Sequence, residues 1–192
     1  ATLALSGTQF LSNTAATSYG GGAYASGAAT LNGGLFQNNS GGFGGGLYTN
    51  ATLALSGTQF LSNTATYYGG GAYASGAATL NGGVFQSNSA RIYGGGLAAF
   101  STLVLTGTQF LSNTATSYGG GAYADGAATL NGGLFQNNTA GNGGGGLVAF
   151  STLALTGTQF ISNTASNGSG VGGGAFAVGA ATLNGGLFQN NS

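Results

Sequence analysis

The chain has 192 residues, and only two of its side chains are charged at neutral pH, Arg91 and Asp125. It contains no Lys, Glu, His, Cys, Met, Trp or Pro, whereas about a quarter of the residues of an ordinary soluble domain are charged. The sequence therefore offers no basic patch for nucleic acid, no disulfide framework, and no run of about 20 apolar residues for a transmembrane helix.

The motif Phe-x-x-Asn, followed by a run of glycines, recurs about every 25 residues along the whole chain. A period of this length is typical of a solenoid, a propeller or another repeat array. We therefore expect residues 1–192 to form a single repeat array, an excerpt of a longer chain. The Phe and Asn pairs are Phe10/Asn13, Phe36/Asn39, Phe60/Asn63, Phe85/Asn88, Phe110/Asn113, Phe135/Asn138, Phe160/Asn163 and Phe188/Asn191.

One repeat unit, residues 51–75, predicts three short strands in chain order. In the first, Leu53 and Leu55 are two residues apart and share a face. In the second, Thr58, Phe60 and Ser62 share a face, with Leu61 opposite, and in the third Ala72 and Ala74 lie opposite Tyr73. Three strands and three turns in about 25 residues predict one coil of a parallel β-helix. The fold class is all-β, with about eight such rungs.

The invariant columns of the repeat have structural explanations. An unchanging Phe column predicts an inward ladder, with each ring resting on the next at about 4.8 Å. The Asn column predicts a ladder of turn residues, in which each Asn takes positive φ or bonds its amide to the next rung. The Gly-Gly-Gly run marks tight corners without room for a Cβ atom. Length differences collect in the turn before this run, and residues 166–171 predict a protruding loop.

Two further columns alternate in size from rung to rung, which predicts volume compensation inside a narrow core. Leu3, Leu53, Leu103 and Leu153 align with Ala29, Ala78, Ala128 and Ala181. Conversely, Ala23, Ala72, Ala122 and Ala175 align with Leu47, Leu97 and Leu147.

The outward positions predict two apolar stripes on an uncharged rod, and we expect these stripes to pack against another copy of the chain. Isolated exposed apolar residues would need no explanation, but continuous stripes do. The first stripe is Leu11, Leu35, Leu61, Val84, Leu111, Leu134, Ile161 and Leu187, alternating with Gln. The second contains Tyr24, Tyr48, Tyr73 and Tyr123.

The repeat at residues 10–24, 60–73 and 110–123, with its Phe-Leu-Ser-Asn and Gly-Gly-Gly-Ala-Tyr motifs, resembles the repeat of the chlamydial-type polymorphic outer-membrane proteins. The resemblance covers nearly the whole chain, although the copies here are more alike and carry far less charge. It implies a right-handed parallel β-helix that forms an extracellular passenger and acts as a surface adhesin or filament.

Catalytic and metal sites are not expected. Glycoside hydrolysis needs paired carboxylates, and general acid–base catalysis needs groups that this chain lacks beyond Asp125. We interpret Arg91 and Asp125 as solvated turn residues. The glycine runs lack the Lys of a phosphate-binding loop, so no cofactor is expected.

We therefore expect a structural fibre, sheath or surface filament at the cell surface or outside it, whose partner is the chain itself, laterally and through uncapped terminal strands. One alternative is an adhesin passenger with a host receptor or a surface glycan as partner. Another is an ice- or carbohydrate-binding face built from Thr2, Thr8, Thr52 and Thr58, a lattice interrupted by Gly34 and Gly83.

Overall fold

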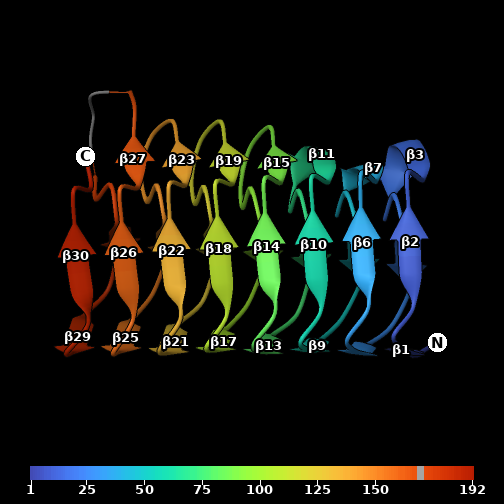
Figure 1. Ribbon diagram of the computed structural model, residues 1–192, viewed down its shortest axis with the longest axis horizontal. Coiled ribbons are helices and arrows are strands. Elements are labelled where there is room, and N and C mark those ends of the chain that lie inside the picture. The colour runs from blue at the N-terminus through green and yellow to red at the C-terminus, as the bar shows by residue number, and fades with distance from the viewer. Residues whose placement is uncertain (168–170) are drawn as a thin grey trace.

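The computed structural model is a parallel β-solenoid and describes residues 1–167 and 171–192. Its coils lie side by side along one axis, from the N-terminus at the right of Figure 1 to the C-terminus at the left. All the regular elements in the described residues are β-strands, and every strand pair is parallel. The solenoid of about 25-residue repeats is thus confirmed. The right-handed sense implied by the resemblance stays a prediction.

Each complete coil contributes four strands, not the predicted three. The extra strand occupies the segment between the Asn and the glycine run, which the sequence had indicated as a turn. In later coils it is only two residues long, Thr-Ala or Ser-Ala, which is too short for an alternating pattern to be recognised. Seven coils are complete, and residues 179–192 supply the first two strands of an eighth. Residues 168–170 of the predicted protruding loop lie outside the described residues.

Sheet A is formed by the first strand of every coil, and lies along the lower edge in Figure 1. Its strands are β1 (Leu3–Ser6), β5 (Ala29–Asn32), β9 (Leu53–Ser56), β13 (Ala78–Asn81), β17 (Leu103–Thr106), β21 (Ala128–Asn131), β25 (Leu153–Thr156) and β29 (Ala181–Asn184).

Sheet B is formed by the second strands and faces the viewer in Figure 1. Its strands are β2 (Gln9–Leu11), β6 (Leu35–Gln37), β10 (Gln59–Leu61), β14 (Val84–Gln86), β18 (Gln109–Leu111), β22 (Leu134–Gln136), β26 (Gln159–Ile161) and β30 (Leu187–Gln189).

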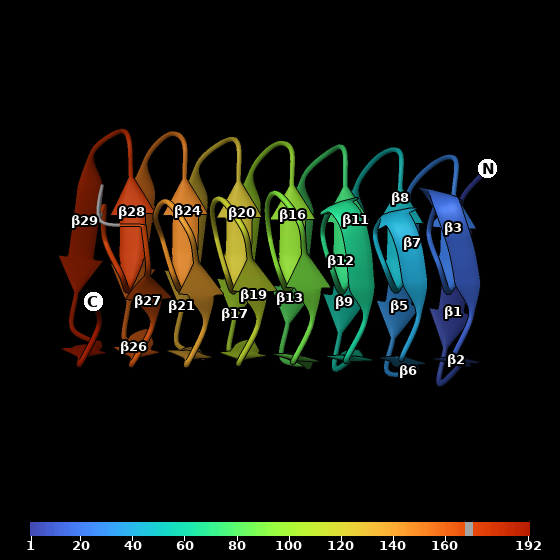
Figure 2. The same ribbon diagram turned by 90° about the horizontal axis from the view of Figure 1, so that it is seen from above.

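Sheet C contains the strands that the sequence did not predict, and Figure 2 shows it from above beside sheet D. Its strands are β3 (Thr14–Tyr19), β7 (Ser40–Phe43), β11 (Thr64–Tyr68), β15 (Ser89–Ala90), β19 (Thr114–Ala115), β23 (Thr139–Ala140) and β27 (Thr164–Ala165). Sheet D follows the glycine runs and contains β4 (Ala23–Ala25), β8 (Leu47–Thr49), β12 (Ala72–Ala74), β16 (Leu97–Ala99), β20 (Ala122–Ala124), β24 (Leu147–Ala149) and β28 (Ala175–Ala177).

The Phe column forms a continuous stack in the core. Successive rings lie 4.6–4.9 Å apart between centroids, with planes within 9–12° of parallel. The six internal rings, from Phe36 to Phe160, are fully buried, whereas Phe10 is partly buried and Phe188 in the incomplete coil is 45% exposed. Beside them, each Leu of one coil faces an Ala of the next, as in the pairs Leu53–Ala78 and Ala72–Leu97, so large and small side chains alternate.

The Asn column forms a ladder of amide hydrogen bonds along the solenoid. The Asn113 Oδ1 accepts hydrogen bonds from the backbone N and the Nδ2 of Asn88, at 2.9 and 3.0 Å. Its own Nδ2 donates to the Asn138 Oδ1 at 3.0 Å and to the Phe85 carbonyl at 2.8 Å. This arrangement satisfies both amide hydrogens and the amide oxygen of each internal Asn.

Two roles were predicted for this Asn column: the amide ladder from rung to rung is confirmed, and positive φ at the Asn itself is wrong. The members of the column are bonded from coil to coil, the first seven lie directly before the strands of sheet C, and the six internal ones are buried. Only the two at the ends of the array have exposed surface, because each lacks a neighbouring coil on one side. The residues of the ladder are Asn13, Asn39, Asn63, Asn88, Asn113, Asn138, Asn163 and Asn191.

The turn is made one residue earlier in each coil. Positive φ, 54–56°, belongs to the residue just before each ladder Asn, and the ladder Asn residues themselves do not adopt it. This turn leaves the following Asn free to point inward, which is the physical reason for the correction. The residues with positive φ are Ser12, Asn38, Ser62, Ser87, Ser112, Asn137, Ser162 and Asn190.

The glycine corner agrees with the sequence prediction. A Cβ atom on Gly71 would lie 2.7 Å from the carbonyl oxygen of Gly96 in the next coil. Such a contact is too short for any side chain, so this position of the repeat requires glycine.

We predict that Asn113→Ala lowers the free energy of unfolding by about 3 kcal/mol or more, because it leaves several buried polar groups without a partner. The exposed Asn131 on the outer face of sheet A provides the matched control, and Asn131→Ala should change stability by less than about 0.5 kcal/mol. Urea unfolding followed by circular dichroism measures both, and equal losses would contradict the ladder.

A second prediction compares two neighbours on opposite faces of β18. Phe110→Asp should prevent folding, because it places an unpaired charge in the fully buried stack. Leu111→Asp, one residue further and facing outward, should leave a cooperative melting transition in place. A normal melting curve for Phe110→Asp would refute the inward ladder.

Candidate functional site

The outer face of sheet B carries a regular pattern of apolar and amide side chains in two columns. Strand register places Gln59 between Leu35 and Val84 in one column, and Leu61 between Gln37 and Gln86 in the other. The two columns are therefore out of phase, and each apolar residue has Gln as its neighbour in the coils before and after. This register places all eight members of the first predicted stripe on one face.

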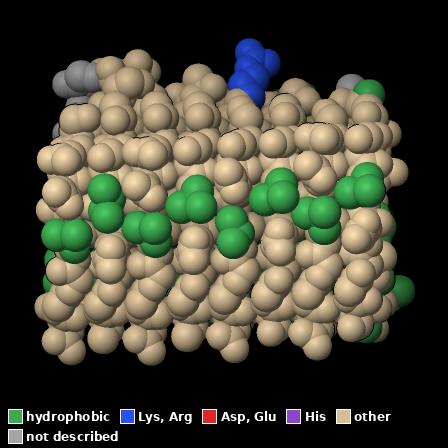
Figure 3. Space-filling model, in the orientation of Figure 1, with side chains coloured by type: hydrophobic (Ala, Val, Ile, Leu, Met, Phe, Trp, Pro, Cys, Tyr) green, Lys and Arg blue, Asp and Glu red, His purple; other side chains and the backbone are tan. Residues whose placement is uncertain are grey.

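These apolar side chains form a zigzag row and not a straight ladder. Figure 3 shows the row crossing the face that sheet B presents to the viewer. Leu11 and Leu187 are 49% and 42% exposed, and the six between them are partly buried by their neighbours. The neighbouring Gln amides are neutral donors and acceptors, so the whole face is uncharged and can form both apolar and hydrogen-bonded contacts.

The predicted tyrosine stripe is only partly an outer surface, and this expectation is corrected. Tyr24 is 51% exposed and Tyr73 is half-buried, but Tyr48 and Tyr123 are buried, with 8% and 4% of their surfaces exposed. All four point away from the solenoid core, as the alternation in sheet D predicts, yet two of them are covered. They do not form an open face for a second copy.

The cover comes from aromatic residues of the same chain. An aromatic residue stands directly before the glycine run in the first five coils: Tyr19, Phe43, Tyr68, Tyr93 and Tyr118. These side chains pack on the outer side of sheet D, with Tyr19 lying 4.5 Å from Tyr48 and Tyr93 lying 4.7 Å from Tyr123 between ring centroids. This second aromatic layer was not predicted, although the fixed position of an aromatic residue before the first five glycine runs was a signal for it.

Burial in this layer changes the acidity of its phenols. The pKa of Tyr73 rises to about 12, first because burial disfavours the phenolate and then because Tyr48 and other tyrosines lie nearby. The pKa of Tyr48 is also raised, mainly by burial. In Tyr123, burial is again the largest cause of a raised pKa, followed by the charge of Asp125, to which the Tyr123 hydroxyl donates a hydrogen bond at 3.2 Å.

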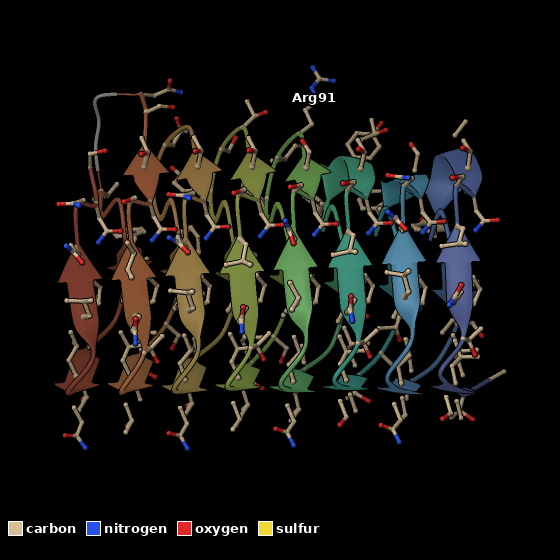
Figure 4. All side chains as sticks on the ribbon, in the orientation of Figure 1. Arg91 is labelled. Atoms are coloured by element: carbon tan, nitrogen blue, oxygen red, sulfur yellow. The ribbon has the colours of Figure 1, made fainter. Side chains whose placement is uncertain are left out.

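The two charged residues lie apart from the sheet B face. Arg91 is exposed and extends away from the coils beyond sheet C, as Figure 4 shows. Asp125 is exposed in the turn after β20, and its hydrogen bond to Tyr123 was not foreseen. Over residues 1–167 and 171–192 there is no pocket and no group of three His, Cys, Asp or Glu side chains.

The four threonines considered for ice or carbohydrate binding differ in exposure. Thr2 and Thr52 are exposed, but Thr8 is only partly exposed and Thr58 is buried. The Thr58 hydroxyl donates to the carbonyl of Gly33 in the preceding coil at 3.0 Å, so it belongs to the internal bonding of the solenoid. The four threonines therefore do not form one open face.

No helix in the part of the chain that the structure describes is both long and apolar enough to cross a membrane. No protein-family model, no curated protein and no solved structure matches this chain.

The raised phenol pKa values predict a loss of stability at alkaline pH. The folded protein keeps the Tyr73 proton up to about pH 12, whereas the unfolded chain releases it near pH 10, so the unfolded state binds fewer protons between these values. This contribution is fully present below pH 10 and is lost as pH rises towards 12. The melting temperature should therefore fall steeply over this range, and Tyr73→Phe should make the fall shallower. An equally steep fall in the variant would contradict this prediction.

Proposed function

We propose that this protein is a structural element of an extracellular fibre, sheath or surface filament, and that copies associate side by side through the outer face of sheet B. The observation that carries the proposal is the uncharged zigzag of apolar side chains on that face. Charge normally keeps soluble proteins apart, and this chain has one residue of each sign.

The pattern on sheet B is self-complementary. Two such faces can meet with their solenoids antiparallel, about a twofold axis that runs along the strands of sheet B at the level of one coil. Coils at equal distances on either side of this axis then face each other, and they carry the same pattern because apolar and Gln positions exchange columns at every coil. Each apolar residue therefore faces an apolar residue of the partner, and each Gln faces a Gln. A twofold contact uses the same surface on both partners, as most homodimers do.

The size of the face sets the strength of the contact. Eight coils at about 4.8 Å and a strand of three residues at about 3.3 Å give roughly 400 Å² on each partner. A stable interface buries about 800 Å² on each side, so one pair of these chains should associate only weakly. The area grows with the number of coils, and many such contacts in a filament reinforce one another.

The resemblance to the polymorphic outer-membrane protein repeat supports the extracellular part of the proposal. It rests on the Phe-x-x-Asn and Gly-Gly-Gly-Ala-Tyr motifs of residues 10–24, 60–73 and 110–123. The adhesin role of that family is the alternative. The proposed role is not enzymatic and needs no cofactor, because Asp125 is the single carboxylate side chain available for acid–base chemistry.

We predict that charge on sheet B abolishes the association. A triple variant, Val84→Lys, Leu111→Lys and Leu134→Lys, places three like charges on the centre of the face, where pairing would bury them without partners. Sedimentation velocity over a range of concentrations should show reversible association of the unaltered chain and a monomer for the variant, and electron microscopy should show lateral bundles only for the unaltered chain.

The matched control places the same charge on the outer face of sheet A. Thr79→Lys, Val104→Lys and Thr129→Lys lie in adjacent coils at exposed positions of sheet A and should leave the association in place. Loss of association in both triple variants would show a general effect of charge and would overturn the assignment to sheet B. A monomeric unaltered chain at high concentration would overturn the proposal itself.

A further inference from the structure

All nine tyrosines of the chain lie in one layer, on the side of the solenoid formed by sheets C and D. The outer faces of sheets A and B carry none. The tyrosines extend from the first coil to the fifth and are Tyr19, Tyr24, Tyr48, Tyr67, Tyr68, Tyr73, Tyr93, Tyr118 and Tyr123.

Six of these rings form a path in which every step joins two tyrosines. The column in sheet D is interrupted at Ala98, and there the path passes through the neighbouring aromatic column, where Tyr68 and Tyr93 stack at 5.1 Å with planes 9° apart. The other centroid separations are 5.5 Å for Tyr24–Tyr48, 4.8 Å for Tyr48–Tyr73, 6.4 Å for Tyr73–Tyr68 and 4.7 Å for Tyr93–Tyr123.

The two ends of this path differ in chemistry. Tyr24 is half exposed, so an oxidant in solution can reach it. Tyr123 is buried, and its hydroxyl donates a hydrogen bond to the Asp125 Oδ1 at 3.2 Å. Asp125 is the only residue of this chain with a carboxylate side chain. A phenol that loses an electron becomes a strong acid, and a neighbouring carboxylate is the group that can accept its proton.

We propose that the tyrosine row is a one-electron relay, in which an oxidising equivalent taken up at Tyr24 moves to Tyr123. The oxidant is of the class of haem peroxidase intermediates or other one-electron acceptors. It takes one electron from Tyr24. Each tyrosine then regains an electron from the next one along the row, and any phenolic proton that it released with its electron returns to it. The net change is that Tyr123 loses one electron, its phenolic proton moves to Asp125, and the oxidant is reduced by one electron.

Tyr48 is the point where this relay can be cut. It is the only tyrosine in the second coil, and the other aromatic residue that this coil contributes to the layer, Phe43, has no hydroxyl and is much harder to oxidise. Its hydroxyl makes one long hydrogen bond, 3.4 Å to the Asn50 Oδ1, so Tyr48→Phe should leave the packing intact. The Tyr118 ring lies 5.9 Å from that of Tyr93, tilted by 46°, and stands beside the path, so Tyr118→Phe is the matched control.

The relay is tested by flash photolysis with a photo-oxidant at a known position. The chain has no cysteine, so Ser26→Cys, exposed and two residues from Tyr24, gives a unique attachment point for a ruthenium trisbipyridyl group. A cobalt(III) ammine complex removes the electron of the excited state, and the oxidised ruthenium then oxidises Tyr24. Transient absorption and electron paramagnetic resonance follow the tyrosyl radical, and melting curves check that each variant is folded.

A radical that reaches buried Tyr123 should persist, whereas one confined to exposed Tyr24 should decay quickly. We expect Tyr48→Phe and Asp125→Asn each to reduce the persistent fraction several-fold, and Tyr118→Phe to leave it unchanged. An unchanged persistent fraction in Tyr48→Phe would overturn the relay, and an unchanged fraction in Asp125→Asn would overturn Tyr123 as its end. None of these outcomes depends on lateral association through sheet B.

Discussion

The fold depends on hydrogen bonding between equivalent asparagines in successive coils. Each internal ladder Asn links three coils, because it accepts from the Asn of the preceding coil, donates to the Asn of the next coil, and donates to the carbonyl of the Phe in the preceding coil. A slip of one residue would turn the Phe ring outward, and in most coils it would also replace the ladder Asn by Ser or Thr, which has no amide to make these bonds. The ladder therefore fixes the register, and the ring stack supplies apolar burial in the same register.

This constraint explains how a chain with almost no charge can still have a specific structure. Polar groups in the interior are few, but none of the buried side-chain nitrogen or oxygen atoms in the described residues lacks a hydrogen-bond partner. Specificity comes from repetition, since each coil presents to the next the same surface that it receives. The outward side chains do not set the contacts between coils, and the outer faces therefore differ from one another. Sheet B carries apolar and amide side chains, sheet A is rich in small hydroxyl residues, and the side formed by sheets C and D is aromatic.

Much of the architecture could be predicted from the sequence because its cause lies in a single column of the repeat. Phe60 and the alternation of Leu53 with Ala78 are visible when the copies are aligned, and both describe contacts between the same positions of adjacent coils. The burial of Tyr123 was not predictable in this way, because it results from contact with Tyr93, which comes from a different position of the repeat in the preceding coil. The fourth strand was missed because the two residues of β15 show no alternation.

The alternation of large and small core residues has a consequence for how such a chain can change length. Leu47 faces Ala23 on one side and Ala72 on the other, and Leu53 likewise lies between Ala29 and Ala78. Removing one coil would bring two leucines together in one sheet and two alanines together in the other, producing overpacking and a void side by side. Removing two coils would restore every contact. The repeat unit that can be added or removed without disturbing the core is therefore the pair of coils, and gene duplications that preserve the core add about 50 residues at a time.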